Sequence, residues 1–258
     1  MRYEIMGTPR LLDNEGYTTI GARKIEILLV TLLIRYNRIV PIDQLITEIW
    51  DTAPPRRATA ALHVYISQLR KFLNRPGRGD SAIITRSGGY VLQLGTDETD
   101  FHDFQALMLQ GREKLRKQHR EDAVTLLQSA LDLWREPALG DLHDGPITNG
   151  FATWLRELHL ECIELLTSTN LMLGRHKQLI GFLRTLINDH PLHEEFYRQL
   201  MLALYRADRR ADALNVYQSA REVLRRELGL EPCRALQDMQ HTILNAERTH
   251  IDPHLTHA

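Results

Sequence analysis

Cysteine is scarce in this sequence: among 258 residues only Cys162 and Cys233 occur. Two thiols so far apart form neither a disulfide framework nor a zinc module, and in a reducing compartment we expect both to be free. Long apolar runs are also missing. No stretch approaches the roughly 18 residues of a membrane span, and the first ten residues lack the apolar segment of a secretory signal. We therefore expect a cytoplasmic protein with no membrane partner.

Acidic residues are absent between Asp51 and Asp80, a local imbalance that the overall net charge of −1 hides. Residues 1–95 carry 13 Lys and Arg against 8 Asp and Glu, whereas residues 96–258 carry 19 against 25. The basic residues of the acid-free stretch are Arg56, Arg57, Arg70, Lys71, Arg75 and Arg78. Such a stretch predicts binding to a phosphate backbone with a steep salt dependence, although a solvated basic helix face has the same charge pattern.

Motifs of catalysis and cofactor binding are missing as well. The sequence contains no HExxH, no Cys/His pair with metal-ligand spacing, no GxSxG elbow and no GxxxxGK[ST] phosphate loop. The acidic pairs Glu157–Glu161 and Glu194–Glu195 fit solvated helix faces better than a paired-carboxylate site. We therefore predict that the protein is not an enzyme and needs neither a metal nor a cofactor.

The first half of the N-terminal region predicts short strands and then two helices. Strand-like segments occupy residues 2–6, 10–12 and 17–20, separated by turn residues. Apolar residues then recur at the spacing of an amphipathic helix from Gly21 to about Asn37, and again from Pro41 to Trp50. The segment Asp51, Thr52, Ala53, Pro54 and Pro55 cannot continue that second helix, because proline lacks an amide donor.

A third helix is expected from Arg56 to Asn74, with a core stripe of Leu62, Ile66, Leu69 and Leu73. Its opposite face is small, polar and basic, as a helix that enters a DNA major groove must be; this face is formed by Arg57, Ala60, Ala61, Val64, Gln68 and Lys71, with Thr59, His63 and Ser67 beside it. Two strands, AIITR and YVLQL, follow and are joined at Ser87-Gly88-Gly89 as a hairpin. Three helices and a hairpin predict a winged helix-turn-helix in residues 1–95.

From residue 100 to about 248 the pattern is helical throughout, so the fold class predicted for the chain is α+β. We expect turns at Gly111, between Pro137 and Pro146, at Gly174 and at Pro191. The segments that start at Leu173 and Ala207 superimpose with a shift of 34 residues, the period of tetratricopeptide helix pairs. We interpret Trp134, Trp154, Tyr205 and Tyr217 as core residues. Residues 249–258 lack an apolar period and are expected to be a frayed tail.

The order of these segments resembles the Streptomyces antibiotic regulatory protein (SARP) family. GARKIEILLVTLL, PIDQLITEIW, PPRRATAALHVYISQLRKFL and SGGYVLQL are similar to the OmpR-type winged helix of that family. DFHDFQALMLQGREKL, SALDLWREPALGD and LMLALYRADRRADALNVYQSAREVLRRELGLEP are similar to its bacterial transcriptional activation domain. The resemblance implies a sequence-specific activator of an antibiotic biosynthetic gene cluster, working at the nucleoid.

The resemblance also implies roles for individual residues. It places Val64 and Gln68 at base edges, Tyr65, Ser67 and Arg70 near phosphates, and Arg86 in the minor groove. Helix periodicity agrees for Val64 and Gln68 but puts Tyr65 and Arg70 at the boundary with the core. Combined with the basic stretch, the predicted DNA-binding set is Arg56, Arg57, Thr59, His63, Val64, Tyr65, Ser67, Gln68, Arg70, Lys71, Thr85, Arg86 and Ser87.

Partners other than DNA come from the resemblance alone. It implies that the loop from Asp51 to Pro55 contacts RNA polymerase, although a plain linker fits that loop equally well. It also implies that the helical region contacts polymerase, whose sigma and alpha subunits are the expected partners, and that two protomers bind direct repeats in promoter DNA. The alternative is a helical-repeat adaptor that no longer binds DNA. The small outward residues of the third helix disfavour the adaptor, since protein-binding faces more often carry aromatic anchors.

Overall fold

The computed structural model describes residues 1–13, 16–74, 81–135 and 137–245, so Arg75, Arg78 and the expected tail at 249–258 lie outside the described residues. Within them the chain forms two compact units. We call Met1–Gln110 with Gln128–Cys162 the front unit, and Gly111–Leu127 with the described residues from Ile163 onward the rear unit. The division by contacts therefore differs from the division near residues 95–100 that composition suggests, because part of the helical region packs with the N-terminal elements.

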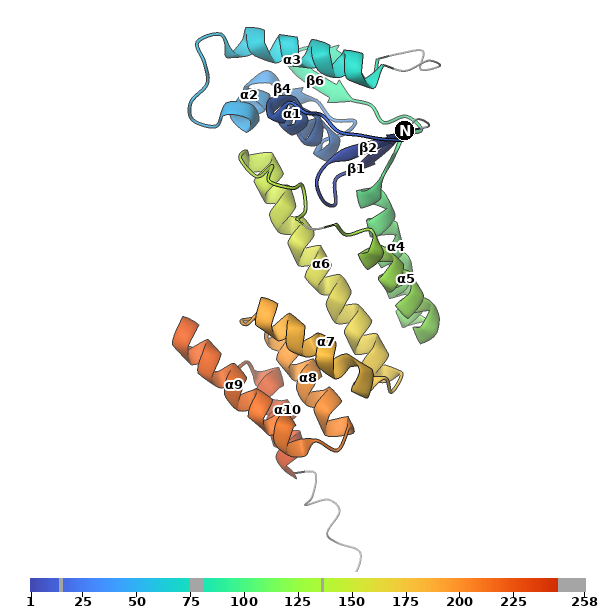
Figure 1. Ribbon diagram of the computed structural model, residues 1–258, viewed down its shortest axis with the longest axis vertical. Helices are drawn as coiled ribbons and strands as arrows, with labels where there is room; N and C mark the ends of the chain where they lie inside the picture. The colour runs from blue at the N-terminus through green and yellow to red at the C-terminus, as the bar shows by residue number, and fades with distance from the viewer. Residues whose placement is uncertain (14–15, 75–80, 136, 246–258) are drawn as a thin grey trace, which may run out of the picture. The chain divides into compact units, whose positions relative to one another are not determined.

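Two small sheets lie in the front unit (Figure 1). One has the strand order β3-β2-β1-β7 and the other the order β4-β6-β5. The strands are β1 (Arg2–Glu4), β2 (Arg10–Asp13), β3 (Gly16–Thr18), β4 (Val40–Pro41), β5 (Ile83–Arg86), β6 (Gly89–Leu92) and β7 (Glu98–Thr99). Strand β7 pairs parallel to β1, with Tyr3 opposite Thr99. The sequence pattern predicts neither β4 nor β7, because a two-residue strand carries no periodicity.

Ten helices are found among the described residues. They are α1 (Arg23–Ile34), α2 (Ile42–Trp50), α3 (Ala58–Leu73), α4 (Asp100–Arg116), α5 (Arg120–Asp132), α6 (Pro146–Met172), α7 (His176–Asp189), α8 (Glu194–Arg206), α9 (Arg210–Leu228) and α10 (Arg234–Asn245). Helices α1, α2 and α3 contact one another, and α1 contacts β6 (Figure 1). The predicted α+β class, a winged helix followed by helices, is confirmed. None of the helices formed by the described residues is long and apolar enough to cross a membrane.

The predicted repeat is visible in the rear unit. Helices α7 and α9 begin 34 residues apart, and both pack against α8. Residues at equivalent positions are buried in both helices: Leu183 corresponds to Tyr217 and Leu186 to Ala220. The repeated apolar spacing therefore corresponds to a repeated helix that packs on a shared neighbour, as in helical-repeat proteins.

Two predictions about the helical region are wrong. Gly111 is not at a turn but inside α4, where an added Cβ would lie 3.0 Å from the Leu127 side chain. The glycine permits close packing of the end of α4 on α5 and does not end the helix. Trp154 is 42% exposed and not a core residue, although its ring contacts Phe101 and Phe151. Of the other three aromatic residues expected in the core, Tyr217 is buried, whereas Trp134 and Tyr205 are half-buried.

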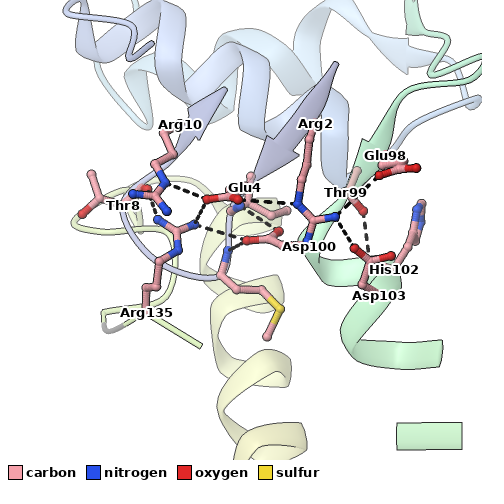
Figure 2. Close-up of polar contacts among 12 residues, drawn as sticks. Arg2, Glu4, Thr8, Arg10, Glu98, Thr99, Asp100, His102, Asp103 and Arg135 are labelled. Atoms are coloured by element: carbon pink, nitrogen blue, oxygen red, sulfur yellow. Dashed lines mark hydrogen bonds and ion pairs between the residues drawn. The ribbon is translucent and has the colours of Figure 1, made fainter. Parts of the chain in front are cut away.

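A buried carboxylate, Asp100, links the first strand region to the start of α4 (Figure 2). Its two oxygens accept the backbone N–H groups of Ile5 and Met6 at 2.9 and 3.0 Å, and the Arg135 guanidinium lies 3.2 Å away. Burial raises the pKa of Asp100, while these N–H groups and the cation act in the opposite direction. The same arginine also reaches Glu4, which Arg10 contacts at 2.6 Å. The network stabilises one arrangement of the strand region, α4 and the chain after α5.

Candidate nucleic-acid interface

Helix α3 has one buried side and one exposed side. Its buried residues are Ala58, Leu62, Ile66, Leu69 and Leu73, which include the whole predicted stripe. The exposed side presents Thr59, His63, Val64, Ser67, Gln68 and Lys71, and Arg56 and Arg57 are exposed just before the helix. Val64 is 53% exposed although it is apolar, and an aliphatic side chain at such a position is suited to contact a thymine methyl group.

The hairpin β5–β6 brings a second exposed cation to the same domain. Thr85 and Arg86 end β5, Ser87 and Gly88 form the turn, and all of them are exposed. Gly88 has φ 81°, a backbone angle that favours glycine. Gly89 is required for a different reason, because an added Cβ would lie 2.3 Å from the carbonyl oxygen of Val40 in β4. The hairpin is thus held close to β4, with Arg86 at its free end.

Arg70 joins α3 to the hairpin. Its Nε donates to the carbonyl oxygen of Ile83 at 3.0 Å and its Nη2 donates to the Thr85 hydroxyl at 2.8 Å. The guanidinium also lies 5.9 Å from the centre of the Tyr90 ring. Arg70 is half-buried as helix periodicity predicts, and its donors bind the wing. Tyr65 lies at the same boundary and stacks on Trp50 with the ring centres 5.8 Å apart.

The remaining cations of this surface are exposed and have no acidic neighbour in the described ranges of the chain. Among the described residues no carboxylate lies within ion-pair distance of Arg56, Arg57, Lys71 or Arg86. Arg23 and Arg10 of the front unit, in contrast, are paired, Arg23 with Asp144 at 2.8 Å and Arg10 with Glu4. Unpaired, exposed cations on a helix and a neighbouring hairpin are a suitable surface for phosphate groups, because DNA binding replaces counterions and not protein carboxylates.

The predicted polymerase loop is also exposed. Asp51, Thr52, Ala53, Pro54 and Pro55 are all accessible, and they connect the end of α2 to α3. Asp51 has φ 50°, an uncommon angle for a residue other than glycine, and its N–H donates to the carbonyl of Thr47 at 2.8 Å. The loop therefore leaves α2 in a defined direction.

Comparison with known proteins agrees with this geometry. Residues 19–92 match the family model described as "Transcriptional regulatory protein, C terminal", and residues 99–244 match the "Bacterial transcriptional activator domain". The chain is 34% identical to Regulatory protein DnrI of Streptomyces peucetius over 253 residues, covering 96% of this chain and 93% of that protein. It is 36% identical to Transcriptional regulator RedD of Streptomyces coelicolor, covering 93% of this chain and 69% of that protein.

A solved structure gives the same architecture. The structure described as Mycobacterium tuberculosis EmbR in complex with a low-affinity phosphopeptide superimposes with a TM-score of 0.89 and 31% sequence identity. The match covers 95% of this chain and 65% of that one, so the present chain spans about two thirds of its length.

Fold, exposed basic surface and family models together define a winged-helix DNA-binding transcriptional activator. Its relatives narrow the class further. The chain belongs to the Streptomyces antibiotic regulatory protein family, as its sequence resemblance predicts.

Proposed function

We propose that the protein activates a secondary-metabolite gene cluster by binding direct repeats in promoter DNA as two protomers and by recruiting RNA polymerase. It acts at the nucleoid and performs no chemistry of its own. The observation that carries this proposal is a set of exposed cations: Arg56 and Arg57 just before α3, Lys71 on α3 and Arg86 on the wing. None of them has an acidic neighbour in the part of the chain that the structure describes. Membership of the Streptomyces antibiotic regulatory protein family, with relatives named as regulators in Streptomyces, supports the class of target genes.

In the proposed complex the outward side of α3 lies in the major groove. Val64 and Gln68 face base edges, and a Gln side chain can bond both N6 and N7 of adenine. Thr59, His63, Ser67 and the cations Arg56, Arg57 and Lys71 flank them toward the phosphates. Arg86 enters the adjacent minor groove, with Thr85 and Ser87 on either side, while Tyr65 and Arg70 support this surface from the core boundary.

Residues 1–95 supply the DNA contacts in this proposal and residues 100–248 supply activation. The loop from Asp51 to Pro55 and the helical region hold polymerase, with its sigma and alpha subunits as the partners. The test requires the full chain. Leu139, Leu142 and Ala152 belong to the same core cluster as the winged-helix residues, so a fragment that ends near residue 95 would expose apolar surface.

The test is footprinting of the full-length protein on DNA upstream of neighbouring genes, followed by a salt titration of the affinity. We expect two adjacent protected repeats and a linear fall of log affinity with log salt. Four phosphate contacts in each protomer, one for each unpaired cation, give a slope of about −3 to −4 per protomer. Absent or salt-insensitive binding would refute the DNA-binding part and favour the adaptor. Protection without added transcription in the presence of polymerase would refute recruitment.

A further inference from the structure

Glu48 of α2 is buried at the start of α6. Glu48 is only 1% exposed, which is unusual for a residue with a carboxylate side chain. One oxygen, Oε1, accepts the backbone N–H of Ile147, and the other, Oε2, accepts the N–H of Thr148 at 3.3 Å. The Thr148 hydroxyl lies 3.2 Å from Oε2 and 3.1 Å from the carbonyl of Gly145, and either oxygen can accept its proton.

These N–H groups belong to the first turn of α6, where no carbonyl of the helix itself can accept them. Capping residues are normally local, two or three positions before the groups they bind. Here the cap comes from about 100 residues earlier in the chain. A carboxylate at this end of a helix also interacts favourably with the helix dipole. We call the contacts of Glu48 with Ile147 and Thr148 the α2–α6 cap.

Gly145 is part of the same arrangement. A Cβ at this position would lie 2.1 Å from Oε2 of Glu48 and 2.8 Å from its Cα. The backbone of α2 cannot yield as a flexible side-chain end can, so only glycine permits this approach. The position of the buried Glu48 carboxylate therefore requires glycine at residue 145.

Further contacts hold the same two segments together. Leu139, Leu142 and Ala152 lie in one apolar cluster with Leu45 and Ile49 of α2. On α1, Arg23 binds Asp144 at 2.8 Å and also Asp141. The start of α6 is thus fixed to the winged helix by a buried charge, a shared core and an exposed ion pair.

We propose that Glu48 is a positioning residue for activation. Glu48 lies one helical turn before the exposed loop from Asp51 to Pro55, so the cap holds that loop and the start of α6 in one geometry. DNA contacts come from α3 and the wing, whereas activation requires the α2–α6 cap. This inference rests on the recruitment proposed above.

The experiment measures DNA affinity and promoter transcription separately with the full-length protein. Gly145→Ala forces α6 away from α2. Gly150→Ala is the matched control, because Gly150 lies in the first turns of α6, five residues after Gly145, and its added Cβ would meet nothing within 4 Å. Glu48→Gln keeps one acceptor oxygen but removes the charge. Thermal melts and circular dichroism establish that each variant is folded.

At protein concentrations that saturate the promoter, we expect Gly145→Ala to reduce transcript yield about tenfold or more, since a buried charge loses its partners. Its DNA affinity should stay within about twofold of wild type, because the cap makes no DNA contact. Glu48→Gln should be intermediate and Gly150→Ala unchanged in both measurements.

Two results would overturn the inference. One is full activation by DNA-bound Gly145→Ala and Glu48→Gln; the other is a loss of transcript that merely follows a loss of DNA occupancy. If Glu48→Gln does not fold, Gly145→Ala and Thr148→Val decide the question. If wild-type protein bound to DNA adds no transcript, recruitment itself fails and the inference with it. If the wild type activates transcription and the variants do not differ from it, the inference about Glu48 is refuted while the recruitment proposal stands.

Discussion

The two compact units use charge differently. In the front unit two carboxylates, those of Glu48 and Asp100, are buried and accept backbone N–H groups. In the rear unit most ion pairs are exposed, as are those of Glu113 with Arg116 and of Glu231 with Arg221. Exposed pairs contribute little, because water screens them and two long side chains must be ordered. Charge therefore fixes geometry in the front unit, while apolar packing of helix pairs is the main source of stability in the rear unit.

The largest effect is expected from removing a buried carboxylate of the front unit. Asp100→Ala leaves the N–H groups of Ile5 and Met6 and the Arg135 guanidinium without their acceptor. The free energy of unfolding should fall by about 3 kcal/mol. Urea denaturation measures this change, with Asp212→Ala, an exposed pair with Arg209, as the control. A loss below about 1 kcal/mol would mean that charge is no more important here than in the rear unit.

A smaller loss is expected from the buried neutral pair of the rear unit. Gln199 is 1% exposed, accepts from the Thr167 hydroxyl and donates to the carbonyl of Glu164 at 3.2 Å. Gln199→Ala should lower the free energy of unfolding by about 2 kcal/mol, because buried polar groups lose their partners. Gln218→Ala is the control, because it makes the same substitution at an exposed position of another helix, α9. Equal urea midpoints for the two variants would contradict this assignment.

The contrast extends to DNA binding. Arg86→Ala removes an unpaired cation from the wing and should weaken promoter binding about fivefold, with a salt slope lower by about one. Arg184→Ala removes an exposed arginine from α7 of the rear unit and should change neither quantity. Gel-shift titrations at several salt concentrations measure both. The wing assignment fails if the two variants behave alike.

Arg70 and Arg86 should be energetically coupled. Since Arg70 binds the Ile83 carbonyl and the Thr85 hydroxyl, it orients the strand that carries Arg86. In a double-mutant cycle for DNA affinity, Arg70→Ala should cost less in the Arg86→Ala background, with a coupling of about 0.5–1 kcal/mol. Strict additivity would show that Arg70 does not act on DNA affinity through Arg86.

The smallest effect is expected at an exposed pair of the rear unit. Arg116 and Lys117 lower the pKa of Glu113 to about 2, chiefly through the Arg116 hydrogen bond. Because the pKa is lowered, the ion pair stabilises the fold at pH values above the ordinary pKa of a glutamate, and this stabilisation is lost as the pH falls toward 2. Glu113→Gln should leave the urea midpoint at neutral pH and moderate salt unchanged within error. For Asp100 the pH dependence of stability has the opposite sign. Because burial raises its pKa, its contribution to the free energy of unfolding declines as the pH rises above the ordinary pKa of an aspartate.

Local patterns account for much of the fold and of the candidate interface. The stripe of Leu62, Ile66, Leu69 and Leu73 predicts both the buried side of α3 and, by exclusion, its exposed side. The 34-residue spacing predicts the matching starts of α7 and α9. Both features follow from the regular spacing of apolar residues along the sequence, because each helix buries the side that carries them. The boundary position of Arg70 is predicted in the same way, but its bonds to the wing are not.

Contacts between distant segments of the chain cannot be predicted from these local patterns. Gly111 and Gly145 are both glycines in helical surroundings, yet one permits packing on Leu127 and the other an approach to Glu48. Trp154 has the spacing of a core residue and is nevertheless exposed.

The sequence by itself determined the class of protein, its helices and the basic face that is proposed to bind DNA, because periodicity and local charge act over a few residues. Only the tertiary structure decided that Glu48 caps a helix about 100 residues away and that Asp100 binds the first strand region. A buried carboxylate is stable only where donors converge on it, and chain segments far apart in the sequence supply those donors.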